Sequence, residues 1–482
     1  MKQGNFGEHQ AKQKGGQRFW VLFLPGVPIA SLLLLNVSPG WRLLSDLVNQ
    51  QFSKLEAPYR YPFSRSLPGT TNPTGSLQKE IAFYQERVSQ APQSGLNQAS
   101  LARAYLKMAR ATEEGSWYLL AEQAAQRSLA NLPFNNHGAV LVLARVAQAR
   151  HDFSEAIDLA KQVLKSQPGD EDALAVMVTA NVATGKLPAA QQAADTLVER
   201  IPTLGTLTLQ ALVKVNQGRD QEAIQAFQSA LAAEEVGETG SSAWTRTLLG
   251  QFYFKRGQLA LAGELYRETL RILPGYPLAL VHLAELETRR KEYKAAASHY
   301  NQVIAYSKEA STVYDHVVLR GMARLQELQG NSPEAKALRF EAEALLRQTA
   351  TGHGSGSFGH RRELAQLLLE TGRSEDVTEA LSLMQAELGI RRDAQTLDTL
   401  AWALSSSGRF SEAQRVMHEA LSSGIRDAGM FYRAGRIEQA LGKSSQARAY
   451  FQLAQETDPT FDKQAQQALG LGWDSDTKVK LR

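Results

Sequence analysis

Few side chains in this 482-residue sequence are arranged in a way that could do chemistry. There is no cysteine, which excludes disulfides, thiolate metal sites and a Cys nucleophile. The nine histidines do not form an H-E-x-x-H motif, and the sequence has neither a P-loop nor a G-x-S-x-G in a strand–turn–helix context. We therefore expect no catalytic residues, no cofactor-binding residues, no metal site and no enzymatic activity.

One segment resembles a nucleotide-binding motif. Gly354–Gly359 reads GSGSFG and has the spacing G-x-G-x-x-G. A dinucleotide site requires a strand before this motif and a βαβ unit around it, whereas a helical pattern precedes it here. His353 and His360 flank the loop, but the loop has no carboxylate or cysteine that would complete a metal site. We interpret residues 349–359 as a Gly/Ser-rich linker and its histidines as solvated.

The charge distribution argues against a nucleic-acid partner. The formal net charge is +4, and much of the basic excess lies at the two ends of the chain. A nucleic-acid-binding protein more often shows a basic face with interleaved aromatic residues inside its folded part. We therefore expect no nucleic acid among the partners.

The N-terminus has the pattern of a membrane anchor. Residues 1–18 form a basic tail, and Phe19–Ser38 contains no charged residue, a length of about 20 residues that suffices to cross a bilayer. Trp20 and Trp41 mark the edges of this segment, where indole rings favour the headgroup layer. Residues 19–41 are therefore predicted to be a single-pass anchor in the cytoplasmic membrane, with the body of the chain outside the cytoplasm.

Two other interpretations of this segment stay open. Pro25, Gly26 and Pro28 interrupt its start, so it is also compatible with a cleaved signal peptide, which would release an exported soluble protein. The third interpretation is a buried helix of a soluble protein. Residues 42–76, with four prolines and two glycines, are predicted to be an extended linker between the membrane and the body.

From about residue 77 the sequence repeats with a period of 34 residues. Ala156 and Ala190, Ala262 and Ala296, Gly408 and Gly442, and Ala413 and Ala447 are each 34 apart. The clearest unit, residues 243–276, contains Leu249-Gly250, Tyr253, Gly257, Leu259, Ala262, Tyr266 and Pro274. Small residues suit close helix contacts, a glycine allows a left-handed turn after the first helix, and a proline ends the second.

These positions resemble the tetratricopeptide repeat, and the resemblance covers about residues 77–470. It implies an all-α solenoid, a right-handed superhelix of about ten helix pairs with a concave groove. Repeats 1–7 are expected in residues 77–348, and repeats 8–10 with a cap in residues 360–470, followed by a tail at 471–482. Residues 360–461 also resemble a stretch found in bacterial membrane or exported tetratricopeptide proteins of uncertain function.

The resemblance also implies which residues face a partner, because certain positions of the first helix of each pair line the groove. Aromatic rings beside cations suit the anchoring of a peptide and its carboxylates, although rings at these positions can equally pack against the next repeat. The positions that this frame gives are Arg103, Lys107, Arg145, Trp244, Phe254, Lys255, Arg289, Trp402, Tyr432 and Arg436.

The sequence therefore predicts a membrane-tethered scaffold that binds other proteins, as peptide segments or helices, and that serves the assembly of envelope or membrane complexes. An accessory component of exopolysaccharide export with a glycan-binding solenoid is the alternative. A body that stays in the cytoplasm is a third possibility. No pattern in the sequence indicates an oligomeric state.

Overall fold

The computed structural model describes residues 55–63, 73–112, 114–307, 312–350 and 359–471, and these residues form helices and connecting turns without any β-strand. The described residues all belong to one compact unit. The predicted basic tail, the anchor at 19–41 and the C-terminal tail beyond residue 471 thus lie outside the described residues. No described helix is long and apolar enough to span a membrane.

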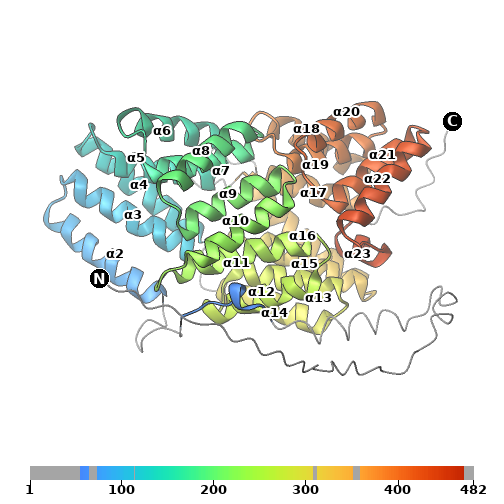
Figure 1. Cartoon of the computed structure of the whole chain (residues 1–482), viewed down its shortest axis with the longest axis horizontal. Helices are drawn as coiled ribbons and strands as arrows, with labels where there is room; N and C mark the ends of the chain where they lie inside the picture. Colours follow the sequence, from blue (N-terminus) through green and yellow to red (C-terminus); the bar gives the residue numbers. More distant parts are fainter. Residues whose placement is uncertain (1–54, 64–72, 113, 308–311, 351–358, 472–482) are drawn as a thin grey trace, which may run out of the picture. The chain divides into compact units, whose positions relative to one another are not determined.

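The described helical elements follow one another along the chain (Figure 1). They are η2 (Ala57–Tyr59), α2 (Pro73–Gln90), α3 (Gly95–Thr112), α4 (Gly115–Asn131), α5 (His137–Ala149), α6 (Phe153–Ser166), α7 (Glu171–Ala183) and α8 (Leu187–Arg200). Next come α9 (Leu204–Asn216), α10 (Asp220–Ala232), α11 (Thr239–Phe254), α12 (Leu259–Ile272), α13 (Pro277–Arg289), α14 (Tyr293–Ser307), α15 (Asp315–Leu328) and α16 (Ser332–Ala350). The last are α17 (Arg361–Thr371), α18 (Ser374–Glu387), α19 (Ala394–Ser406), α20 (Phe410–Ser422), α21 (Ala428–Ala440), α22 (Ser444–Thr457) and α23 (Lys463–Ala468).

The described helices from α3 to α22 form ten consecutive hairpins, each odd-numbered helix packing on the next even-numbered one. We call these hairpins repeats 1–10, and their first and second helices A and B. The prediction of an α-solenoid with about ten helix pairs is confirmed for this part of the chain. The predicted start at residue 77 falls inside α2, which precedes repeat 1 and packs against α3.

The turn between helices A and B has a left-handed residue in most repeats. Glycine occupies it at Gly185, Gly218, Gly257, Gly330, Gly372, Gly408 and Gly442, all with φ between 67° and 84°. In repeats 2 and 6 the residues are His151 (φ 62°) and Lys291 (φ 64°). The 34-residue spacing of glycines in the sequence therefore reflects a recurring backbone requirement.

Small residues in helix A receive aromatic rings from helix B. A Cβ atom on Gly250 would lie 2.5 Å from Cε1 of Tyr266, and one on Gly435 would lie 2.5 Å from Cε1 of Phe451. Tyr266 is fully buried and also stacks on His282 of the next repeat, with 5.8 Å between ring centroids. One ring thus joins its own hairpin to its neighbour, which explains the glycine–aromatic pairing in the repeat.

The array also makes contacts between repeats that lie six apart. Glu114 pairs with Thr312, and the amide of Arg392 donates to the carbonyl of Ala183 at 3.1 Å. A Cβ atom on Gly218 would lie 1.9 Å from the carbonyl oxygen of Gly424. In each case the A–B turn of one repeat meets the segment that leads into helix A of the sixth repeat after it.

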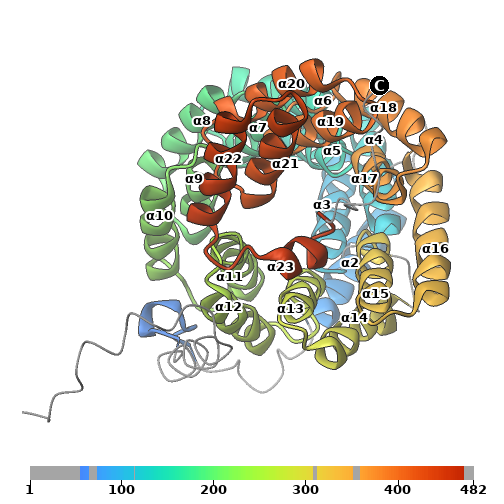
Figure 2. The ribbon, with the colours of Figure 1, turned by 90° about the vertical axis from the view of Figure 1, so that its right-hand side faces the viewer.

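The same relation joins repeats 2 and 8, where the His151 ring lies 3.2 Å from the Gly359 carbonyl. It also joins the turn of repeat 5 to the segment after repeat 10, because a Cβ atom on Gly257 would lie 2.2 Å from Asp458. Six repeats therefore complete one turn of the superhelix, and successive turns touch. Figure 2 looks along this superhelix.

Residues 55–63, inside the predicted linker 42–76, pack on the array. Leu55 and Tyr59 are buried with side chains of α9–α13, and the Tyr59 hydroxyl lies 3.1 Å from that of Tyr253. The amide of Tyr61 donates to Glu268 at 2.8 Å. Over residues 55–63 the expected extended spacer is therefore docked on the array instead, because its aromatic side chains contact side chains of the repeats. Of the predicted linker 349–359, residues 351–358 lie outside the described residues.

Candidate partner-binding surface

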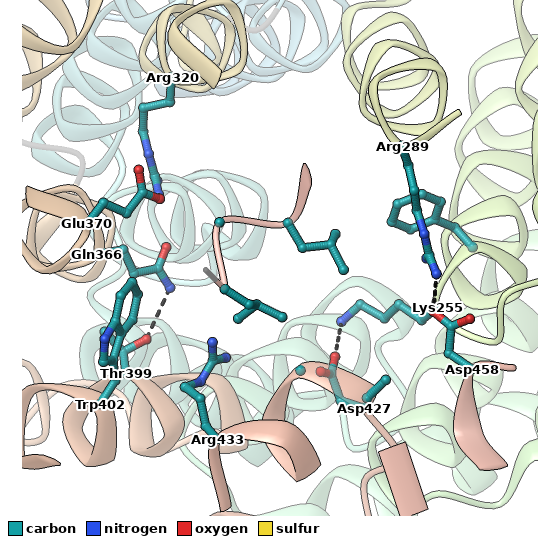
Figure 3. Close-up of a pocket in the computed structure, with 16 residues that line it drawn as sticks. Lys255, Arg289, Arg320, Gln366, Glu370, Thr399, Trp402, Asp427, Arg433 and Asp458 are labelled. Carbon is teal, nitrogen blue, oxygen red and sulfur yellow. Dashed lines mark hydrogen bonds and ion pairs between the residues drawn. The ribbon is translucent and has the colours of Figure 1, made fainter. Parts of the chain in front are cut away.

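A cavity of about 220 Å³ lies on the inner side of repeats 5–10. Its lining comes from the A helices and from residues 458–471 (Figure 3). Four of the lining residues, Arg320, Gln366, Thr399 and Arg433, are each the sixth residue of their own helix A, in four successive repeats. Equivalent positions of stacked helices point to the same side, and they therefore form a row.

Polar contacts join the neighbouring A helices that carry this row. Arg320 pairs with Glu370 at 3.1 Å, and the Gln366 amide donates to the Thr399 hydroxyl at 3.0 Å. Arg433 binds Asp398 through two nitrogens, with 2.7 Å from Nε, and its guanidinium lies 5.5 Å from the ring centroid of Trp402. These contacts fix the orientation of the inner side chains.

On the other side of the cavity two more cations are paired. Lys255 lies 3.2 Å from Asp427. Arg289, only 6% exposed, places its guanidinium 5.3 Å from the Phe254 ring centroid and 2.5 Å from Asp458. Positive and negative groups thus alternate around the cavity, with an aromatic ring next to a guanidinium on each side.

Three acidic groups in or beside the cavity have shifted pKa values. Burial raises the pKa of Glu370, but Arg324 and Arg320 lower it more, and the net direction is downward. Burial likewise raises the pKa of Asp427, which Lys255 and the Met430 amide bring below its ordinary value. For Asp398 burial outweighs Arg433, and its pKa is raised. The first two carboxylates therefore stay ionised and keep their cationic partners oriented.

Of the ten predicted groove residues, the structure brings four together at this cavity: Phe254, Lys255, Arg289 and Trp402. The six others lie elsewhere. On the early repeats Arg103 is exposed, Lys107 pairs with Glu80 at 2.7 Å and Arg145 pairs with Asp172 at 3.3 Å.

The remaining three predicted residues are half-buried. Trp244 packs against the apolar cluster of α7–α9. Tyr432 contacts the rings of Phe451 and Phe461, each with 5.8 Å between centroids. Arg436 lies one turn further along α21. No comparison tests the ten as partner-binding residues, and they stay a prediction.

Sequence reasoning did not select Arg320, Gln366, Glu370, Thr399, Asp427 or Arg433. For Arg320, Gln366, Thr399 and Arg433 the signal was a shared sixth place in successive A helices, which becomes visible once the helix starts are aligned. The groove positions taken from the family resemblance did not include this place.

The expectation that His360 is solvated is wrong. His360 is 9% exposed, and its ring lies 4.6 Å from that of His316 and 6.0 Å from that of His151, measured between centroids. The three histidines come from repeats 2, 7 and 8, which only the turn-to-turn contact brings together. Within the described ranges, no group of three or more His, Asp or Glu side chains has an arrangement that could hold a metal ion.

Comparison with protein families identifies tetratricopeptide repeats in three segments of the chain. Models described as "Tetratricopeptide repeat" match residues 147–206, 208–277 and 399–460. These segments contain repeats 3, 5 and 10 and most of repeats 4 and 9, so these parts of the chain carry tetratricopeptide repeats, as the sequence predicted.

Curated relatives of this chain include cellulose synthase operon proteins. The chain is 23% identical over 354 residues to "Cellulose synthase operon protein C" of Pseudomonas fluorescens, a match that covers 70% of this chain and 26% of the relative. It is 27% identical over 269 residues to "Cellulose synthase 1 operon protein C" of Komagataeibacter xylinus, covering 52% of this chain and 19% of the relative. The matches span about a quarter or less of the length of these relatives.

Solved structures with a similar helical arrangement include a human IFIT1 dimer with PPP-AAAA and the type IV pilus biogenesis factor PilW. The IFIT1 chain is 15% identical, with 85% of this chain and 93% of that chain covered and a TM-score of 0.44. PilW is 19% identical, with coverages of 46% and 96% and a TM-score of 0.36.

Proposed function

We propose that this array is a scaffold, and not an enzyme, that binds protein partners through the inner face of repeats 5–10. The observation that carries the proposal is the row of sixth residues in successive A helices, flanked by Trp402 and Phe254. Aromatic rings held beside guanidinium groups suit the anchoring of a peptide segment or helix, whose carboxylates would meet Arg320, Arg433 or Lys255.

A membrane tether is the second part of the proposal. It rests on the apolar segment 19–41 between a basic tail and the body, and it places the body outside the cytoplasm of a bacterial cell, where it would gather envelope proteins. A cleaved signal peptide would place the same body there in soluble form. A reporter fused after Arg482 tests this: activity only inside the cell would contradict an extracytoplasmic body.

The binding surface is tested by comparing Trp402→Ala with a matched aromatic substitution elsewhere. Phe134→Ala is the control, because Phe134 is 79% exposed and lies in the loop before α5, away from the cavity. Partners are recovered from cells by crosslinking and affinity purification of the full chain. We expect Trp402→Ala and Arg433→Ala to lower recovery of the same proteins at least fivefold, with unchanged far-ultraviolet circular dichroism. Equal recovery for these variants and the control would contradict the proposal.

A second candidate function is a role in exopolysaccharide export with glycan binding by the solenoid, and the relatives named for cellulose synthase operons favour it. The chain offers suitable groups in Trp402, Gln366 and Thr399, because a ring can stack on a sugar face while amides and hydroxyls bond its hydroxyl groups. Titration of the purified protein with cellohexaose, followed by tryptophan fluorescence, tests this function. A saturable change that Trp402→Ala abolishes would support it, and no change up to millimolar cellohexaose would contradict it.

A further inference from the structure

The segment after repeat 10 does not continue the array outward. Where an eleventh hairpin would begin, α23 contacts chiefly α13 and α15, which belong to repeats 6 and 7. Figure 2 shows it turned into the opening that the other helices surround. Residues 458–471 of the chain itself therefore lie against the face that the proposed function assigns to a partner.

The contacts of this segment begin at an acidic turn. Asp458 and Thr460 both bind the Arg289 guanidinium, at 2.5 and 2.8 Å, and Asp458 is 2% exposed. The Thr460 amide closes the turn on Asp458 at 2.9 Å. Phe461, 4% exposed, packs on Tyr432. The segment is thus anchored by one buried ion pair and one ring.

Beyond that anchor the contacts become sparse. Gln464 donates to the carbonyl of Arg289 at 3.0 Å, and Ala465 is the buried residue of the six-residue helix α23. A Cβ atom on Gly470 would lie 2.5 Å from Arg324, and one on Gly429 would lie 3.2 Å from Leu471. Leu469, in contrast, is 39% exposed. So short a helix is marginal by itself, and it buries too little apolar surface to be a firm part of the core.

We propose that residues 461–471 are an internal ligand of the array, which fills the inner face next to α13, α15 and α21 and which a protein partner must displace. This inference rests on the proposed function for the identity of the competitor, but the docking of the segment is independent of it. The site selects a segment with an aromatic residue at its start, followed by a short helix with a small residue on the buried side and a Leu-Gly-Leu end.

The test uses the full chain and a fluorescein-labelled peptide of residues 461–471 as probe. Ala465→Asp places a charge on the buried side of α23 and should release the segment, whereas Gln467→Asp places the same charge on its exposed side and is the matched control. We expect the peptide to bind Ala465→Asp at least ten times more tightly than the wild type or Gln467→Asp, as measured by fluorescence anisotropy. A peptide that carries the Ala465→Asp change itself should not bind.

Failure of a folded Ala465→Asp chain to bind the peptide would overturn the inference, as would equal binding to all three proteins. Should this variant not fold, hydrogen exchange of the wild-type chain decides. We then expect amides of α23 to exchange at least ten times faster than those of α22, and equal rates would show a fixed cap. Neither measurement needs a natural partner, so both are separate from the recovery experiment on Trp402, which tests the proposed function.

Discussion

Arg246 illustrates how single residues connect distant parts of the chain. Its side chain is fully buried, and it donates from Nε to the carbonyl of Tyr59 at 2.8 Å and from Nη2 to Glu234 at 2.8 Å. The charges of Arg246 and Glu234 are both removed from water. A buried charge that loses its partner cannot be compensated by solvent, so this pair should be sensitive to the removal of either member.

We predict that Arg246→Leu lowers the free energy of unfolding by about 3–5 kcal/mol, because it leaves the Glu234 carboxylate buried without a cation. Arg409→Leu is the control, since the Arg409–Glu412 pair is about 40% exposed on each side and such surface pairs contribute less than about 1 kcal/mol. Urea unfolding of both variants measures the difference. Equal losses would contradict the account of Arg246.

Folding shifts the pKa values of the three clustered histidines and of nearby Glu387 in opposite directions. Burial lowers the pKa of His316 to about 3 and that of His151 to about 4, and it also lowers that of His360. Burial raises the pKa of Glu387 to about 7, against the opposing effect of Arg391. Glu363, Arg361, Arg362 and Arg320 face the same region from α15 and α17. Because these charged groups interact with the histidines and with Glu387, the groups of the cluster titrate together and not independently.

The sign of each contribution follows from linkage. A histidine whose pKa is lowered on folding favours the unfolded state as the pH falls from its ordinary value of about 6.5 towards 4. A glutamate whose pKa is raised loses its stabilising contribution as the pH rises from about 4.5 to 7. We predict that His316→Asn reduces the loss of stability between pH 6.5 and 4, and that Glu387→Gln reduces the loss between pH 4.5 and 7. Melting temperatures measured from pH 4 to 8 test both, and profiles parallel to the wild type would contradict the assignment.

At the scale of an element, the A–B turn serves two purposes. It reverses the chain within a hairpin, and in repeats 1–5 it also docks on the segment six repeats later. A comparison of Gly218 with Gly408 separates these two roles. Both residues have positive φ angles, 68° and 76°. A Cβ atom on Gly408 would meet nothing within 4 Å, whereas one on Gly218 would strike the Gly424 carbonyl.

We predict that Gly408→Ala costs about 1–2 kcal/mol, the strain of a left-handed non-glycine residue. Gly218→Ala should cost distinctly more, since the carbonyl of Gly424 must also move. Hydrogen exchange should then rise at the start of α21 only in the Gly218 variant. Thermal unfolding and exchange of the two variants measure this, and equal effects would mean that the contact between turns carries no stability.

At the scale of the whole described array, contacts six repeats apart change its expected behaviour. In an open solenoid each repeat touches only its neighbours, and stability is close to a sum of nearest-neighbour contributions. Here repeats 1–5 also touch repeats 7–10 and the segment after them. Local destabilisation should therefore spread along the chain to the neighbours and also across the superhelix to the next turn.

Leu400→Ala in α19 tests this coupling. Leu400 is 4% exposed, and the truncation should cost about 2–5 kcal/mol through the cavity that it leaves. We predict faster amide exchange in repeat 9 and its neighbours and, in addition, in α7 and α8 of repeat 3, through the contact of Ala183 with Arg392. Repeat 1 is the internal control, because its A–B turn meets the segment that leads into repeat 7, through Glu114 and Thr312. Exchange that changes only in repeats 8–10 would contradict coupling between turns.

The sequence by itself determined the helices, the ten hairpins, the turn glycines such as Gly408 and the glycine–aromatic pairs such as Gly250 with Tyr266. These features recur every 34 residues because the physical requirement is local: one turn and one helix contact per repeat. It also indicated four residues of the inner cavity, since their places in helix A follow from the same period.

Only the tertiary structure decided which residues meet across the superhelix. The histidine cluster, the docking of residues 55–63 and the inward turn of α23 all depend on the small rotation between successive repeats, which accumulates over six of them. No short sequence pattern specifies this accumulated rotation. The contact between His151 and His360, which are 209 residues apart, could therefore not be recognised in the sequence. The contact of Asp458 with Arg289 has the same origin, because about one turn of the superhelix separates these two residues along the array.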